Sequence, residues 1–161
     1  MSNRPDWHQT WLDIAAAVAR RSYDPKWKVG AIIVSEDNTT MLALGYNGNY
    51  PGGPHERDSD DVGASGFIHA EENALIKAPY HYPQPKVMYV TVSPCYMCAK
   101  KIINAGISRV IYTQPYTTNM TGVELLNSVD IPCKSIEAVH LFEAETRVAR
   151  ELADIAERYD T

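Results

Sequence analysis

The spacing of apolar side chains along the chain predicts an alternation of helices and strands. Trp7, Trp11, Ile14 and Val18 recur at helical intervals behind Asp6, a residue type that often caps a helix N-terminus, so we expect an opening helix. Short runs of apolar and β-branched residues predict strands over 29–34, 41–45, 86–92 and 109–113, with a weaker strand near residue 131. Helical spacing predicts helices over 68–77, 94–105 and 121–129, and one or two closing helices over 135–159.

The order of these elements predicts the fold class. The first two strands are joined by the short turn 36–38 and form a hairpin, whereas the later strands alternate with helices and form parallel βαβ units. We therefore expect an α/β protein with a mixed sheet of about five strands covered by helices. At roughly 150 residues per domain, residues 1–161 make a single domain, with core motifs over about 20–127 and a closing helix over about 136–159.

Composition and charge exclude several classes of protein. Apolar residues make up 45% of the chain and charged residues 22%, which is typical of a globular domain and not of a disordered or fibrous one. The net charge of −5 does not favour a stable nucleic-acid partner. No apolar run approaches the roughly 20 residues of a membrane helix. The opening residues contain no hydrophobic secretion segment, so we expect a cytoplasmic protein with no membrane partner.

Two short motifs carry the residue types of a metal site. His69 precedes Glu71 by two positions, and Cys95 and Cys98 form a Cys-x-x-Cys pair after Pro94. Each motif stands at the predicted start of a helix, where the helix dipole favours a thiolate. One imidazole and two thiolates are three zinc ligands, which leaves the fourth tetrahedral position for water, as in catalytic zinc sites. We expect Glu71 to carry protons between that water and a substrate rather than to bind the metal.

A non-catalytic, zinc-stabilised binding module is the alternative from a different class of protein. Such a module needs a fourth protein ligand and has no use for Glu71. The remaining cysteine and histidine residues stand at no familiar ligand spacing, and they are Cys133, His8, His55, His81 and His140. We expect Cys133 to be a small buried apolar residue.

The two motifs together resemble the signature of zinc-dependent nucleobase deaminases. Four segments resemble deoxycytidylate (dCMP) deaminases, especially the phage and bacterial forms, and they are Trp27-Lys28-Val29-Gly30-Ala31, Gly45-Tyr46-Asn47-Gly48, His69-Ala70-Glu71-Glu72-Asn73-Ala74 and Met88-Tyr89-Val90-Thr91-Val92-Ser93-Pro94-Cys95. The resemblance implies the cytidine deaminase-like fold, a three-layer α/β sandwich with a mixed five-stranded sheet. It also implies hydrolytic deamination of dCMP to dUMP and ammonia, feeding thymidylate synthesis, with Glu71 protonating N3 of cytosine and the departing amine.

The resemblance also implies a set of substrate contacts, which are Asn47, Ala70, Ser93, Tyr116, Lys26 and Lys28. Asn47 matches a family asparagine that bonds the sugar hydroxyl, and Tyr116 stands where the family has a tyrosine near the phosphate. The backbone at Ala70 and Ser93 orients the base, and one of the lysines meets the phosphate. Plainer alternatives are open, because Asn-Gly favours turns in any protein, a tyrosine often only packs, and a lysine at a strand end is often only solvated.

Regulation and assembly are further implications of the resemblance. Many dCMP deaminases are homohexamers that dCTP activates and dTTP inhibits with Mg²⁺, and the Gly-Tyr-Asn-Gly loop and the segment after it contribute to that regulatory site. The candidate residues here are Tyr46, Gly48, Asn49 and Arg57. The acidic stretch 56–61 would repel a bare triphosphate, so a cation or Arg57 is needed there. The regions that bind a second zinc in some phage relatives, 23–25 and 54–57, contain no cysteine, so we expect one zinc ion per chain.

A tRNA adenosine deaminase is the alternative within the same superfamily, because it shares the style of the second motif. It would need a positive surface for the RNA. The acidic composition and the Gly-Tyr-Asn-Gly loop favour dCMP as the substrate.

Overall fold

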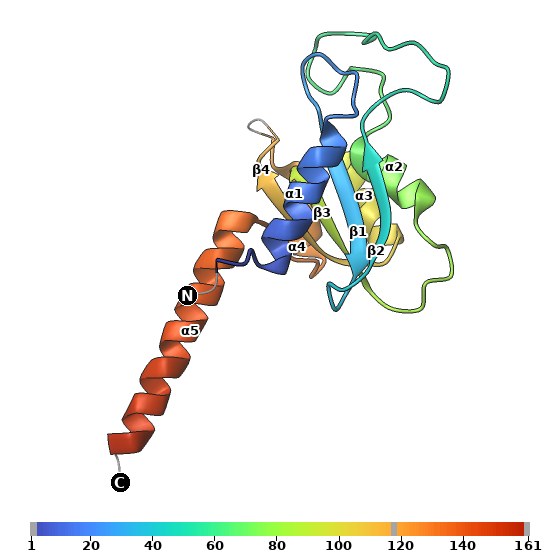
Figure 1. Cartoon of the computed structure of the whole chain (residues 1–161). Helices are drawn as coiled ribbons and strands as arrows, with labels where there is room; N and C mark the ends of the chain where they lie inside the picture. The colour runs from blue at the N-terminus through green and yellow to red at the C-terminus, as the bar shows by residue number, and fades with distance from the viewer. Residues whose placement is uncertain (1–2, 117–118, 160–161) are drawn as a thin grey trace.

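A computed structural model of the chain describes residues 3–116 and 119–159. Within them, a mixed sheet of five strands has the order β2-β1-β3-β4-β5 (Figure 1). β1 pairs antiparallel with β2 and with β3, whereas β3, β4 and β5 run parallel. The predicted hairpin and the predicted parallel section are thus confirmed. The strands are β1 Gly30–Ser35, β2 Met41–Tyr46, β3 Lys86–Val92, β4 Ile107–Gln114 and β5 Cys133–Ser135.

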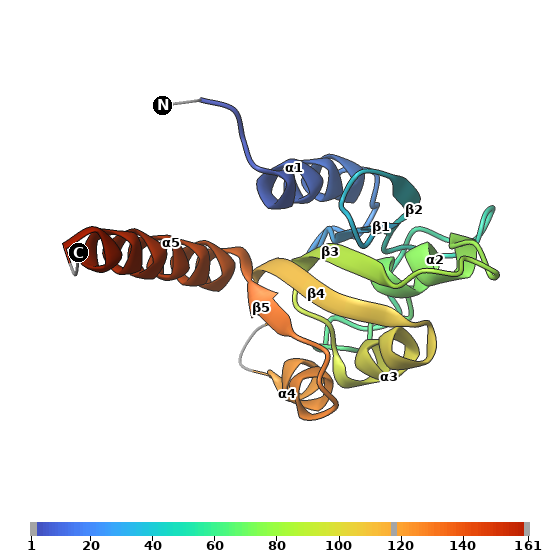
Figure 2. The same cartoon turned by 90° about the horizontal axis from the view of Figure 1, so that it is seen from below.

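Helices cover both faces of the sheet, which gives the predicted three layers (Figure 2). α1 and the start of α5 lie on one face, where Trp11, Ile32 and Ile136 share a buried cluster. α2, α3 and α4 lie on the other face, where a second cluster surrounds Met88 and Ile102. The helices are α1 Trp7–Ala19, α2 Ala70–Lys77, α3 Tyr96–Asn104, α4 Thr121–Ser128 and α5 Ile136–Tyr159.

The central strands β1 and β3 are buried on both faces, which explains their continuous apolar runs. All six residues of β1 are buried, and so are Met88 and Tyr89 of β3. Successive side chains of a strand point to opposite faces, so Met88 packs under α2 and α3 while Tyr89 packs under α1. Each such fully buried side chain contributes about 1.5–3 kcal/mol to folding. The sheet therefore forms a firm base for the helices that carry the candidate site.

The start of the last strand differs from the prediction, whereas the closing helix agrees with it. The last strand begins at Cys133 instead of near Ile131, because Pro132 has no N–H to donate and pairs with β4 only through its carbonyl, which accepts from the Val110 N–H at 2.8 Å. Residues after this strand form one continuous helix, α5. Cys133 is buried, as predicted.

α5 projects away from the rest of the molecule, as both views show (Figures 1 and 2). Its first turns touch the body, where His140 pairs with Asp6 at 2.9 Å and Glu143 pairs with His8 at 3.4 Å. From residue 147 to residue 158 every side chain is exposed. Within the described part of the chain, no helix has both the length and the apolar character to cross a membrane.

Candidate active site

Two helix N-termini bring the predicted metal ligands together, and the first belongs to α2. His69 is the N-cap of α2 and has an extended backbone, because Ile68 before it still pairs with Gly48 in an isolated β-bridge. The helix therefore begins at Ala70 and not at the predicted residue 68. Gly45 of β2 permits the close approach of this helix, since a Cβ atom at Gly45 would collide with the backbone carbonyl of Ala70.

The second N-terminus belongs to α3. Cys95 is the N-cap, and its Sγ accepts a hydrogen bond from the Cys98 N–H at 3.5 Å. The prediction that Pro94 lies in the first helical turn is therefore wrong, because Pro94 stands one residue before the cap. Gly106 follows the C-cap with φ of 72°, as the predicted helix end requires. Gly122 of α4 packs against this loop, since a Cβ atom there would collide with the Pro94 carbonyl.

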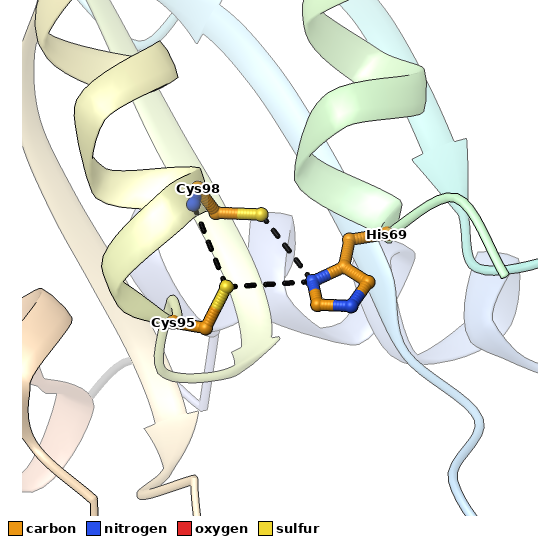
Figure 3. Close-up of side chains that lie close together, drawn as sticks. All are labelled: His69, Cys95 and Cys98. Atoms are coloured by element: carbon orange, nitrogen blue, oxygen red, sulfur yellow. Dashed lines mark hydrogen bonds between the residues drawn. The ribbon is translucent and has the colours of Figure 1, made fainter. Parts of the chain in front are cut away.

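His69, Cys95 and Cys98 form a compact group of donor atoms (Figure 3). The His69 Nδ1 lies 3.5 Å from the Cys95 Sγ and 3.4 Å from the Cys98 Sγ. For a tetrahedral zinc ion with bonds of about 2.05 Å to nitrogen and 2.3 Å to sulfur, the expected nitrogen–sulfur separation is about 3.6 Å. Both nitrogen–sulfur distances are close to that separation, and all three donor atoms lie within 4.8 Å of one another, so these residues fit a zinc ion.

Hydrogen bonds within this group favour one thiolate. A hydrogen bond from the Cys98 thiol lowers the pKa of Cys95 to about 3, despite the opposing effect of burial, and a hydrogen bond from His69 adds to this. The same contact with Cys95 raises the pKa of His69. The hydrogen bond with Cys95, together with burial, raises the pKa of Cys98. The site therefore holds a thiolate, which is the form that binds a metal.

Glu71 lies next to the three predicted ligands and outside their cluster of donor atoms. It is only 4% exposed and lines the same pocket as His69 and Cys95. Burial raises the pKa of Glu71 to about 7, although the nearby His69 opposes this shift. A carboxyl group with a pKa near the ambient pH can both accept and donate a proton, as a general acid–base catalyst must.

The residues after Glu71 anchor α2 to its neighbours. Glu72 does not line the pocket and pairs with Lys101 of α3 at 2.7 Å. The Asn73 side-chain amide donates to the Tyr46 carbonyl oxygen at 2.8 Å. These two contacts tie α2 to α3 and to β2, so the helices that begin after His69 and Cys95 are fixed relative to each other.

A pocket with a cavity volume of about 70 Å³, partly open to solvent, adjoins the group. Seven predicted site residues line it, and they are Asn47, Arg57, His69, Glu71, Ser93, Cys95 and Tyr116. The sequence analysis missed further lining residues, among them Asp24, Trp27, Val62, Gly63 and Ser65. These come from the connection before β1 and from the long loop 47–66, which the structure folds over the site.

Asp24 and Arg57 form a buried ion pair at the rim of this pocket. The Arg57 guanidinium lies 2.6 Å from the Asp24 carboxylate, with side-chain exposures of 7% and 2%. Burial opposes ionisation of Asp24, but hydrogen bonds from the Lys26 N–H, from Arg57 and from the Trp27 N–H keep the pKa of the Asp24 carboxyl below its usual value. Asp24 precedes Pro25, and an Asp at such a position often bonds the backbone two residues on. The Asp-Pro pair therefore predicts only a local turn. It does not predict the ion pair with Arg57, which lies 33 residues further along the chain.

Asn47 is held by the same network. Its side-chain oxygen accepts from the Val29 N–H at 2.8 Å, and its amide group donates to the Trp27 carbonyl at 2.7 Å and to Asp24 at 3.3 Å. The side chain thus fixes the connection between α1 and β1 while it lines the pocket. Its predicted contact with a sugar hydroxyl stays a prediction.

Ser93 and Tyr116 form the opposite wall. Ser93 is buried, and its Oγ accepts a hydrogen bond from the Tyr116 N–H at 2.7 Å. This bond joins the end of β3 to the loop after β4, so the Tyr116 backbone is held at the pocket. Ala70 is fully buried at the start of α2, behind His69.

The remaining predicted residues lie elsewhere. Among the described residues that line the pocket, neither Lys26 nor Lys28 occurs. The Lys26 ammonium pairs with Asp60 at 3.1 Å, and the Lys28 ammonium donates to the Ser22 carbonyl at 2.7 Å.

The four candidate regulatory residues do not form one group. Tyr46 ends β2, and Gly48 pairs with Ile68. The Asn49 amide donates to the Pro54 carbonyl at 3.2 Å. Arg57 alone of the four lines the candidate active site.

Comparison with known proteins identifies the family. The family model described as the cytidine and deoxycytidylate deaminase zinc-binding region matches residues 5–114. The chain is 35% identical over 140 residues to ComE operon protein 2 of Bacillus subtilis, covering 83% of this chain and 73% of that protein. It is 34% identical over 125 residues to the deoxycytidylate deaminase of Mycobacterium phage D29, covering 68% of this chain and 96% of that protein. It spans only 48% of the length of the Saccharomyces cerevisiae deoxycytidylate deaminase.

A solved structure supports the same assignment. The crystal structure of dCMP deaminase from the cyanophage S-TIM5 in complex with dCMP and dUMP matches with a TM-score of 0.71 and 27% identity. The match covers 84% of this chain and 100% of that one. The cytidine deaminase-like fold is therefore confirmed. The family match spans both motifs and all three donor residues, and on this evidence the chain belongs to the cytidine and deoxycytidylate deaminase family.

Proposed function

We propose that this protein hydrolyses dCMP to dUMP and ammonia. The observation that carries the proposal is the buried Glu71 carboxyl beside the three donor residues, inside a pocket that is open to solvent. Relatives named deoxycytidylate deaminase, and a similar enzyme crystallised with dCMP and dUMP, support dCMP as the substrate.

His69, Cys95 and Cys98 would hold one zinc ion, because their donor atoms fit tetrahedral coordination. A zinc ion there would activate water as a nucleophile at neutral pH. Glu71 then moves the protons. It takes one from the attacking water, whose oxygen bonds to C4, and gives it to N3 of the cytosine ring. It next takes the proton of the new C4 hydroxyl and gives it to the amino group, which leaves C4 as ammonia. Its pKa of about 7 suits both directions of transfer.

The pocket walls would position the nucleotide. In the proposed arrangement Asn47 faces the sugar, Tyr116 lies near the phosphate, and the backbone of Ala70 and Ser93 orients the base. Support comes from the position of Asn47, Ser93 and Tyr116 in one pocket. Lys26 and Lys28 are the weaker part of the proposal, because each already has a protein partner.

Regulation, assembly and location complete the proposal. We expect activation by dCTP and inhibition by dTTP with Mg²⁺ through the segment that contains Tyr46, Gly48, Asn49 and Arg57, and a homohexameric assembly. We also expect a cytoplasmic enzyme whose product feeds thymidylate synthesis. Titrating each triphosphate into a steady-state assay tests the regulation, and an unchanged rate and curve shape would contradict it.

The decisive test compares Glu71→Gln with Glu72→Gln. The two carboxylates are neighbours in sequence, but only Glu71 lines the pocket, whereas Glu72 pairs with Lys101. We expect Glu71→Gln to keep its zinc content and fold and to lose about 10²–10⁴-fold in kcat, and Glu72→Gln to stay within a few-fold of the parent.

The substrates for this comparison are cytosine, deoxycytidine, dCMP, dCTP and a tRNA anticodon stem-loop. Full activity of Glu71→Gln on dCMP would contradict the mechanism. Turnover of the tRNA instead of dCMP would contradict the substrate.

A further inference from the structure

A second pocket lies on the face of the sheet that α1 and α5 cover. It is enclosed by α1, β4, β5 and the first turns of α5, has a cavity volume of about 280 Å³ and is partly open to solvent. Its apolar walls come from Ile111, Pro132, Val139 and Phe142. No described residue lines both this pocket and the candidate active site, so the two are separate.

The pleat of the sheet directs two cationic side chains into this pocket. Arg109 and Ile111 stand two positions apart on β4, so their side chains point to the same face of the sheet. Ile111 belongs to the buried cluster beneath α1, and Lys134 of β5 stands beside Ile111 in the strand register. Both Arg109 and Lys134 line the pocket.

Arg109 lacks the partner that a buried donor requires. Its Nε–H is buried and has no hydrogen-bond acceptor within the described residues. Glu143 is the one carboxylate of the described lining residues, but it pairs with His8 at 3.4 Å and is 55% exposed. A buried donor without an acceptor loses its bonds to water and gains none in return. An anion in the pocket would supply the missing acceptor.

The charge of this pocket is opposite to that of the chain as a whole. The chain has a net charge of −5, yet the described lining residues of this pocket include two cations and one carboxylate. Lys134 also lies over the ring of Phe142, with its Nζ 5.5 Å from the ring centroid, so one cation stands directly beside an apolar wall. A concave surface with positive charge and apolar walls favours an anionic ligand with an apolar part.

We propose that this pocket binds a small molecule in which one phosphate or carboxylate group is joined to an apolar ring. The planar fork of the Arg109 guanidinium matches either anionic group, and Lys134 adds a second positive charge. The ring would pack between Val139 and Phe142. A cavity of roughly 150 Å³ holds a benzene molecule, so about 280 Å³ leaves room for the ring and its anionic group. The proposal does not depend on which reaction the candidate active site performs.

Calorimetry on the full-length, zinc-loaded protein tests the ligand class. The probes are phenyl phosphate and benzoate, which share the ring and differ in the anionic group. Binding of either supports the site, and the tighter of the two identifies the group. Inorganic phosphate and benzyl alcohol each lack one half of the ligand and should bind about tenfold more weakly or worse. If inorganic phosphate or benzyl alcohol bound as tightly as the tighter probe, the proposed ligand class would be wrong.

Variants test the two cations. We expect Arg109→Met to weaken binding of the tighter probe by about tenfold or more, because it removes a charge-assisted hydrogen bond, and Lys134→Met to weaken it by several-fold. The matched control is Arg147→Met, which removes the same charge from an exposed position of α5 outside this pocket. It should leave the affinity within about twofold. Circular dichroism establishes that each variant is folded, and the exposed Lys134 keeps the test open should Arg109→Met fail to fold.

Methyl NMR of protein labelled at isoleucine and valine locates the bound probe. We expect the methyl signals of Ile111 and Val139 to shift on titration, and those of Val62 and Val92, which line the candidate active site, to stay in place. Shifts confined to Val62 and Val92 would overturn the proposal, because the probe would then occupy the other pocket. So would the absence of binding by both ring probes at millimolar concentration, or equal affinity of the parent, Arg109→Met and Lys134→Met.

Discussion

Replacing Arg57 with methionine removes one partner of the buried ion pair and leaves the Asp24 carboxylate in place. Breaking a buried pair by removing one partner costs about 3–5 kcal/mol, because the other charge remains buried without compensation. Asp24 keeps the hydrogen bonds from the Lys26 N–H at 2.8 Å, the Trp27 N–H at 3.2 Å and Asn47 at 3.3 Å. We therefore expect a loss at the lower end of that range, about 3 kcal/mol. For a chain of this size, that corresponds to a fall in Tm of roughly 6–12 °C.

Urea unfolding of the zinc-loaded protein at pH 7 measures this loss. Two comparisons isolate the pair. Asp24→Asn keeps an oxygen that accepts from the two backbone N–H groups, so Arg57→Met should cost less than about 1 kcal/mol in that background. Lys26→Met breaks the Lys26–Asp60 contact, whose side chains are 43% and 77% exposed, and should also cost less than about 1 kcal/mol.

The pH dependence gives an independent check. The folded-state pKa of Asp24 lies below its unfolded value of about 3.9, so its stabilisation is complete above pH 4 and is lost as the pH falls through the folded-state pKa. Without Arg57 that pKa rises, so the difference in unfolding free energy between parent and Arg57→Met should shrink on acidification. A loss below 1 kcal/mol at pH 7, or the same loss in the Asp24→Asn background, would refute the reasoning.

Three further predictions concern the core and the metal group. Gly122→Ala should displace the loop at Pro94 and weaken zinc retention, measured as faster zinc release to a chromogenic chelator; an unchanged release rate would show that the loop tolerates the methyl group. Ile102→Ala, at a fully buried position, should lower the free energy of unfolding by about 2–5 kcal/mol in urea titrations. Tyr89→Phe should cost about 1–2 kcal/mol in the same titrations, because it removes the hydroxyl that contacts His8 at 2.7 Å and leaves a part-buried group unpaired; no loss would mean that water replaces the contact.

The local patterns of the chain predicted most of the architecture. Continuous apolar runs in β1 and β3 and helical spacing in α1 indicated elements that the structure confirms. A strand buried on both faces needs apolar residues in succession, whereas a helix buried on one face needs them at helical intervals. The two boundaries that failed have different causes, a remote partner for α2 and a proline at the strand start for β5. Ile68 pairs with Gly48, which delays the start of α2, and Pro132 delays β5.

The donor residues of the metal group were predicted from their residue types, from their spacing and from the resemblance of the two motifs to the signature of zinc-dependent deaminases. Tertiary structure alone decided that their donor atoms stand at zinc-ligand separations, that Glu71 is buried beside them, and that Arg57 reaches back 33 residues to Asp24. It also decided that the amphipathic α5 leaves the body instead of covering the sheet. The sequence determines the types of side chain and their spacing along the chain. The distances between residues of remote segments are set only when the whole chain packs.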